Sequence, residues 1–148
     1  MKRVKIALIF LSLSIPMMFA YSSSTELSVM RDQEKEALAK ETINEFYDAA
    51  ALGDVEKIQA LLSGAYAKRI RSTIEYPGYD QTLKKYYGSV AVEEMDVTLD
   101  SISRATVRSK TISPVHGVEQ VFWTLELQAS TEAFQYFIVD MRTTETPL

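Results

Sequence analysis

Few residues in this chain could do chemistry. There is one histidine, His116, and no cysteine, which excludes disulfides, thiolate metal ligands and a cysteine nucleophile. A metal site with two histidine ligands from this chain is excluded as well. His116 lies in the segment Pro-Val-His-Gly, which is typical of a solvated turn. No serine has a predicted histidine and carboxylate beside it, so we expect no hydrolase triad, no metal centre and no bound cofactor.

Asp140 is the candidate that remains for a catalytic group. A carboxylate in an apolar cavity has its charged form disfavoured and can act as a general base. Tyr47 and Tyr66 could reach the same cavity and donate hydrogen bonds to a developing oxyanion. The alternative, which the residues favour, is that Asp140 caps a strand end or pairs with a cation such as Arg142. Other aromatic residues are expected in the core or the pocket wall: Tyr86, Tyr87, Trp123 and Tyr136.

The first twenty residues have the pattern of an export signal. Lys2, Arg3 and Lys5 form a basic start, and the apolar run Ile6 to Ala20 follows. That run is shorter than the roughly 20 residues that a bilayer-spanning helix needs. We therefore predict a secretory signal at 1–20, a polar leader at 21–32, and a periplasmic or secreted protein. The alternative is an uncleaved membrane anchor.

The chain that would remain after cleavage suits one acidic domain, over residues 33–145. Cleavage after Ala20 removes three of the 16 basic residues and none of the 20 acidic ones, which leaves a net charge of −7. Binding to a phosphate backbone requires clustered cations, so nucleic acid is not an expected partner.

Apolar spacing predicts helices in the first half of this domain. Residues 33–52 carry one apolar stripe, Gly53 is placed to end that helix, and Asp54 is placed to cap the next one. The second helix is expected to end at Gly64. The spacing of Tyr66, Ile70 and Ile74 suggests a further helix, although residues 65–79 are ambiguous. A turn follows at 77–78, and then a short helix capped by Asp80 and closed by Gly88.

After Gly88 the apolar period changes from about 3.6 residues to two. The alternation predicts four strands, over 90–100, 104–112, 118–128 and 134–141. Loops this short join consecutive antiparallel strands, so we predict an α+β fold with N-terminal helices packed on a curved four-stranded antiparallel sheet.

Opposite charges support a register for the first three strands. Pairing 104 with 100 and 118 with 112 sets three charged pairs on one face: Glu94–Lys110, Asp96–Arg108 and Asp100–Arg104. The same register sets Val97 opposite Val107, and Val107 opposite Trp123, on the apolar face. A slip by one residue would bury the charges, so the apolar alternation fixes the register.

The last strand is expected to pair Ile138 with Trp123. The residues that then face the core are Phe134, Tyr136, Ile138 and Asp140. The opposite choice, in which Phe137 and Val139 face the core, remains open. The outer face would carry an apolar patch of Phe122, Phe137, Val139 and Met141. A soluble monomer tends to cover such a patch. The leader segment could cover it, or a second copy could dock there.

Residues 34–145 resemble the nuclear transport factor 2-like superfamily, also called the cystatin-like or cone fold. The resemblance rests on Phe46, Tyr47, Ala49, Gly53 and Asp54 in the first helix, and on Ile138, Val139 and Asp140 in the last strand. It implies a pocket between the first helix and the concave sheet face, and dimerisation through the sheet. Ketosteroid isomerase, one member, uses an aspartate base and a tyrosine donor, but this chain has no match to that enzyme's early aspartate.

Three functions agree with these observations, because fold resemblance does not supply an activity. The first is an exported, non-catalytic domain that binds a small apolar ligand or a protein partner as a homodimer. The second is a cofactor-free isomerase or dehydratase that uses Asp140 with Tyr47 or Tyr66. The third is an envelope assembly subunit.

Overall fold

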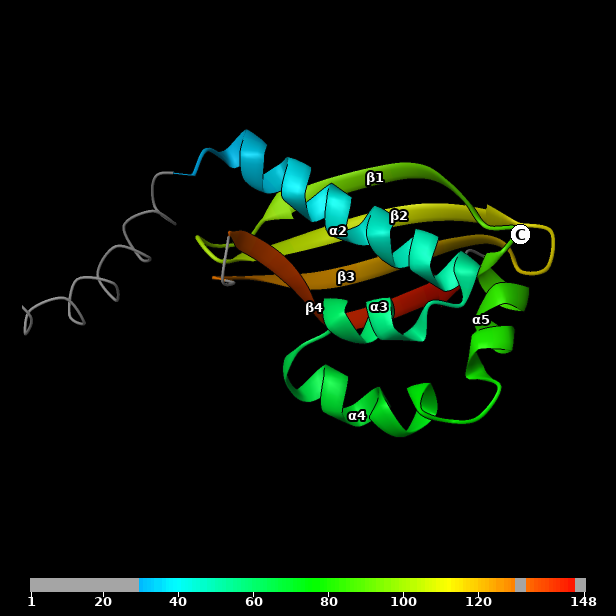
Figure 1. Ribbon diagram of the computed structural model, residues 1–148. Coiled ribbons are helices and arrows are strands. Elements are labelled where there is room, and N and C mark those ends of the chain that lie inside the picture. The colour runs from blue at the N-terminus through cyan, green and yellow to red at the C-terminus, as the bar shows by residue number, and fades with distance from the viewer. Residues whose placement is uncertain (1–29, 130–132, 146–148) are drawn as a thin grey trace, which may run out of the picture.

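The computed structural model describes residues 30–129 and 133–145. Within these residues, four helices precede four strands. The helices are α2 (Asp32–Leu52), α3 (Val55–Leu61), α4 (Gly64–Ile74) and α5 (Tyr79–Tyr87), and the strands are β1 (Ala91–Leu99), β2 (Arg104–Ser113), β3 (Gly117–Ala129) and β4 (Phe134–Glu145). The strands form one antiparallel sheet in the order β1-β2-β3-β4 (Figure 1). The predicted α+β fold, with helices first and a curved four-stranded sheet after them, is confirmed. The predicted signal and most of the predicted leader lie outside the described residues.

The first long helix forms where the apolar stripe predicts it. α2 buries Ala39, Ile43 and Ala50 completely. It ends at Gly53, whose φ of 69° is left-handed, and the Gly53 amide donates back to the Ala50 carbonyl. The Asp54 side chain accepts a hydrogen bond from the Lys57 amide, which confirms its role as the cap of α3.

Two predicted helix boundaries are wrong. α3 ends at Leu61 instead of Gly64, because Leu62 forms a parallel bridge with Ile138 of β4 and leaves the helix. The Ser63 amide then donates to the Ile138 carbonyl, and α4 starts at Gly64. The cap residue of α5 is Gly78, and Asp80 lies inside the first turn, where its charge suits the helix dipole.

The register of β1, β2 and β3 agrees with the prediction. Val97 pairs with Val107, and Val107 with Trp123, both on the side that faces the helices. Arg108 forms an ion pair with Asp96, and Lys110 lies 3.7 Å from Glu94 and 3.3 Å from Glu93. The third expected ion pair is not formed, since the Asp100 carboxylate accepts a hydrogen bond from the Thr106 hydroxyl.

The predicted register of β4 is wrong. Ile138 pairs with Leu125, and an irregularity follows at Val139, so that Asp140 pairs with Thr124 and Met141 with Trp123. Tyr136 and Ile138 face the core as predicted. One extra residue reverses the alternation beyond it, which turns Met141 toward the core and removes Asp140 from the core face.

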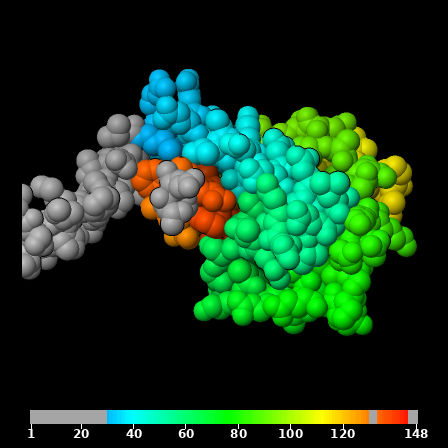
Figure 2. All heavy atoms as spheres, viewed as in Figure 1, coloured from blue at the N-terminus to red at the C-terminus, as the bar shows by residue number. Residues whose placement is uncertain are grey.

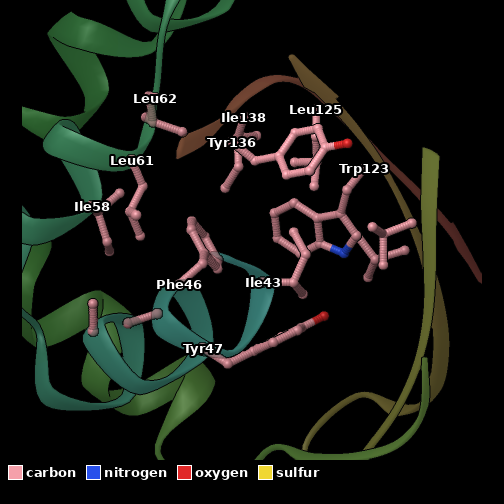
Figure 3. Close-up of a cluster of buried hydrophobic side chains, with 14 of the residues drawn as sticks. Ile43, Phe46, Tyr47, Ile58, Leu61, Leu62, Trp123, Leu125, Tyr136 and Ile138 are labelled. Carbon is pink, nitrogen blue, oxygen red and sulfur yellow. The ribbon is translucent and has the colours of Figure 1, made fainter. Parts of the chain in front are cut away.

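The helices cover the concave side of the sheet. α2 runs across that face in Figure 1, with α5 beyond its C-terminal end and α4 beneath α3. Figure 2 shows side chains of α2 to α5 covering most of the sheet from this side. In the core between the layers, Phe46 and Tyr47 of α2 pack against Trp123, which is 1% exposed (Figure 3). No helix within the described residues is both long and apolar enough to cross a membrane.

Candidate functional site

A buried hydrogen-bonded cluster joins α2 to the sheet, and we call Tyr47, Ser109 and Trp123 the polar hub. The Trp123 indole Nε1–H donates to the Ser109 hydroxyl at 2.9 Å, and the Tyr47 and Ser109 hydroxyls are hydrogen-bonded at 3.0 Å. Ser109 is completely buried. Burial raises the pKa of Tyr47, although hydrogen bonds from Ser109 and Trp123 act in the opposite direction. The Tyr47 hydroxyl is therefore neutral and engaged in a structural contact.

The space in which Tyr47 and Trp123 were expected to line a pocket is filled. The Phe46 ring packs 4.8 Å from the Trp123 ring and 6.0 Å from the Tyr47 ring, in edge-to-face geometry (Figure 3). Such pairs are the normal packing of a core. Tyr47 and Trp123 thus stabilise the helix–sheet contact.

Tyr136 is also a core residue. Its side chain is completely buried, and its hydroxyl has no hydrogen-bond partner among the described residues. A buried hydroxyl without a partner loses its hydration and gains nothing in return. The predicted place of Tyr136 on the core face is confirmed, but the residue packs among Ile138, Leu125 and Trp123 (Figure 3).

Replacing Tyr136 by phenylalanine is expected to leave the free energy of unfolding unchanged, or to raise it by up to ~1 kcal/mol, because it removes an unpartnered polar atom and keeps the ring. Urea unfolding followed by circular dichroism measures the difference. Tyr47→Phe is the matched comparison, and it should be destabilising because the Tyr47 hydroxyl is bonded. A clear loss of stability in Tyr136→Phe would contradict the structure.

The prediction that Asp140 faces an apolar cavity is wrong. Its carboxylate forms ion pairs at 3.2 Å with Arg69 of α4 and with Arg142. Partial burial raises the pKa of Asp140, but hydrogen bonds from Arg142, the Met141 amide and Arg69 outweigh it and hold the pKa below its usual value. Asp140 therefore stays ionised and paired, as the alternative reading with Arg142 expected, and is poorly suited to accept a proton near neutral pH.

Tyr66 belongs to the same group at the edge of the sheet. The Arg69 guanidinium that pairs with Asp140 lies 5.2 Å from the centre of the Tyr66 ring, within the range of a cation–π contact. Burial is the largest effect that raises the pKa of Tyr66. The residues predicted to line one pocket thus lie in three separate places. Tyr47 and Trp123 belong to the polar hub, Tyr136 is in the core, and Tyr66 and Asp140 lie beside Arg69.

A hollow lined largely by tyrosines lies along α5, and we call it the tyrosine hollow. It has a volume of about 180 Å³. Positions 79, 83, 86 and 87 share one face of the helix, and that face turns toward α2 and the sheet. Leu83 is buried at its base, and the Tyr87 ring packs 5.9 Å from Phe46. The lining residues are Tyr79, Thr82, Leu83, Tyr86 and Tyr87.

The hydroxyls of Tyr79 and Tyr87 beside this hollow are neutral. Burial raises the pKa of Tyr87 far above its usual value, and the neighbouring hydroxyls of Tyr47, Tyr86, Tyr79 and Tyr66 raise it further. Burial also raises the pKa of Tyr79. Neutral phenols can donate and accept hydrogen bonds while their rings offer apolar contact. The hollow therefore combines apolar walls with polar edges.

A carboxylate and an imidazole contact Tyr86, one of the residues that line the hollow. The Tyr86 hydroxyl donates to the Glu119 carboxylate, at 3.0 and 3.1 Å from its two oxygens. The His116 ring stacks on the Tyr86 ring, with centroids 4.0 Å apart. His116 is an exposed residue of the β2–β3 turn, as the sequence suggests, but the turn also brings it against α5.

Sequence reasoning identified part of this site. It assigned Tyr86 and Tyr87 to the core or pocket wall, where they lie. It missed Tyr79 and Glu119. Glu119 could have been identified from the sequence, because it alternates with Val121 and Trp123 along the same strand and these two residues face inward. A charged residue at an inward position indicates a polar or functional role.

The outer sheet face carries some of the predicted apolar patch. Phe122 is 36% exposed and borders a shallow depression with Asp96, Thr98, Thr106 and Arg108. Phe137 pairs with Glu126 and is half-buried, as is Val139. Met141, the fourth predicted member, packs against the core because of the irregularity at Val139, so its placement in this patch was wrong.

Neither metal-ligand geometry nor comparison with known proteins identifies a function. Within residues 30–129 and 133–145, no three acidic or histidine side chains are arranged to hold a metal ion. The chain matches no protein-family model and no curated protein. The function must therefore be inferred from the tyrosine hollow and the residues around it.

Proposed function

We propose that this protein is a non-catalytic binding domain for a small ligand, and that the ligand binds in the tyrosine hollow. The observation that carries this proposal is the convergence of three tyrosine side chains, Tyr79, Tyr86 and Tyr87, on one recess, with the Tyr86 hydroxyl bonded to a carboxylate. Small-molecule sites are concave and mostly apolar, with a few polar groups that orient the ligand. The hollow has this composition.

The size of the hollow limits the ligand. Its volume of about 180 Å³ is below the roughly 300–1,000 Å³ of sites for drug-sized molecules. A single ring or a branched head group fits such a space, and a fused ring system does not. The rest of a longer ligand would extend into solvent.

Binding is better supported than catalysis by the state of the carboxylates. A general base works best when its pKa lies near the operating pH. Ion pairs lower the pKa of Asp140, the base that the sequence suggested. The hydroxyl of Tyr47, one of the two proposed oxyanion donors, is engaged with Ser109. The isomerase or dehydratase alternative thus loses its expected base and one of its two expected donors, the other being Tyr66.

The wider setting of this function stays a prediction. Helices followed by a meander agree with the nuclear transport factor 2-like superfamily that the sequence resembles, in which the pocket lies on the concave side. Export to the periplasm or the medium follows from the pattern of residues 1–20. A homodimer through the outer face would bury Phe122 and Phe137.

A bulky side chain at Thr82 should block the hollow. Ligand-detected NMR with a set of single-ring alcohols and small methylated amines should show binding of at least one compound to the protein. Thr82→Trp should abolish it, because Thr82 lines the hollow and the indole would occupy the space. Thr73→Trp, the same change at an exposed position of α4, should retain it. The proposal fails if no compound binds or if binding survives Thr82→Trp.

A further inference from the structure

The walls of the tyrosine hollow are suited to a positive charge. The face of an aromatic ring carries a negative partial charge and attracts a cation within ~6 Å of the ring centre. Three of the five lining residues are tyrosines. The Tyr86 and Tyr87 rings lie 4.7 Å apart at an angle of 54°, so they form two differently oriented walls of one recess. Tyr79 stands one turn before Leu83 on the same face of α5.

Glu119 strengthens this attraction in two ways. Its carboxylate carries a negative charge and accepts a hydrogen bond from Tyr86, a residue that lines the hollow. A phenol that donates to a carboxylate also has more electron density in its ring, which makes the ring a better partner for a cation. The Glu119 carboxylate is therefore a counter-ion for the ligand, and it also increases the electron density of the Tyr86 ring.

The arginine and lysine side chains near the hollow are directed elsewhere. Arg69 pairs with Asp140 and covers the Tyr66 ring. Lys84 of α5 extends along Gly53, on the side of the helix away from Tyr79 and Tyr86. Lys85, the other cation in the last turn, is exposed. The His116 ring covers one face of Tyr86. A ligand cation would thus meet the remaining tyrosine faces, with the Glu119 carboxylate bonded to one of those rings.

We infer that the ligand of the tyrosine hollow is a small organic cation, an ammonium ion that bears methyl groups. This inference rests on the proposed function and names the class of ligand. An anionic ligand would be repelled by Glu119. A neutral ligand of the same shape would gain the ring contacts and lose the charge attraction. Methyl groups spread the positive charge over an apolar surface, which matches tyrosine walls better than a strongly hydrated ammonium ion does.

The test compares two probes of the same shape on the full-length protein. Choline carries a trimethylammonium group, and 3,3-dimethylbutan-1-ol carries the uncharged tert-butyl equivalent. Isothermal titration calorimetry at constant ionic strength should give a dissociation constant about tenfold lower for choline. Ammonium chloride at the same ionic strength should not compete with choline, because it lacks the methyl groups.

Three variants assign the effect to the hollow. Glu119→Gln keeps the shape and should reduce the advantage of choline to about twofold or less, with the affinity for the alcohol unchanged. Tyr79→Leu should weaken choline more than the alcohol, and Tyr79→Phe should restore choline binding because it keeps the ring.

The outcomes separate this inference from the proposed function. Equal affinity for the two probes, with both lost in Thr82→Trp, would overturn the cation inference and leave the binding function standing. No binding of either probe, nor of any compound in the NMR set, would overturn both. Tighter binding of choline that Glu119→Gln does not change would also overturn the inference, since the charge would then come from elsewhere.

Discussion

Ser109→Ala is expected to lower the free energy of unfolding by about 2–4 kcal/mol, although it removes one oxygen atom. Ser109 accepts the Trp123 indole hydrogen and is hydrogen-bonded to the Tyr47 hydroxyl. Without the Ser109 hydroxyl, the Trp123 indole N–H and the Tyr47 hydroxyl stay buried but lose their hydrogen bond to Ser109. A buried polar group without a partner costs roughly 1–3 kcal/mol. Urea unfolding followed by the fluorescence of Trp123, the single tryptophan, measures this change.

Two further variants test whether the effect of Ser109→Ala comes from the polar hub or from the loss of any buried hydroxyl. Thr111→Val is the matched control, because Thr111 is the next inward residue of β2 and is buried without a side-chain hydrogen bond among the described residues. It should change stability much less. Tyr47→Phe combined with Ser109→Ala should cost less than the two single changes added together, since one orphaned hydroxyl is then gone. Strict additivity would contradict a coupled hub.

The architecture could be predicted from the sequence because apolar alternation leaves few choices. Val107 and Trp123 must face the same side in any register that keeps Asp96 and Arg108 in solvent, and these residues pair as expected. Gly53 and Asp54 gave the α2–α3 boundary through their intrinsic preferences for a left-handed stop and a cap. Such signals are local, and they agree with the global fold.

The last strand could not be predicted fully because its irregularity has no local signature. Both faces of β4 carry apolar residues, so alternation alone cannot exclude an extra residue at Val139. That single residue decides whether Asp140 points into the core or toward Arg69. The candidate base was therefore wrong for a geometric reason, and not because its chemistry was unsuitable.

The site itself depends on contacts between distant segments. Glu119 meets Tyr86, 33 residues away in sequence, and His116 reaches the same ring from the β2–β3 turn. No spacing rule relates these positions before the helices are docked. The sequence supplied the tyrosine-rich face of α5, whereas the partners of that face required the tertiary structure.

The position of α5 depends in turn on Gly53. A Cβ atom at Gly53 would lie 2.7 Å from the Asp80 carbonyl oxygen and 2.8 Å from Cε of Lys84. The lysine can move aside, but the carbonyl belongs to the first turn of α5 and moves only with the helix. The close approach of α2 and α5 thus requires glycine for both its left-handed φ and its lack of a side chain.

Gly53→Ala is therefore expected to lower the free energy of unfolding by about 2–5 kcal/mol. A left-handed alanine costs roughly 1–2 kcal/mol, and overpacking against α5 adds roughly 1–3 kcal/mol. Since α5 must shift, ligand binding in the tyrosine hollow should weaken as well. Chemical denaturation measures the first effect, and the choline titration measures the second.

Gly64→Ala separates the two contributions. Gly64 has nearly the same φ, 67°, but a Cβ atom there would meet nothing within 4 Å. This variant should cost only the roughly 1–2 kcal/mol of the left-handed conformation, and it should bind ligand as the unchanged protein does. If the two alanine variants were equally stable and bound ligand equally well, then α5 would not be held against the end of α2 in the way that fixes the hollow.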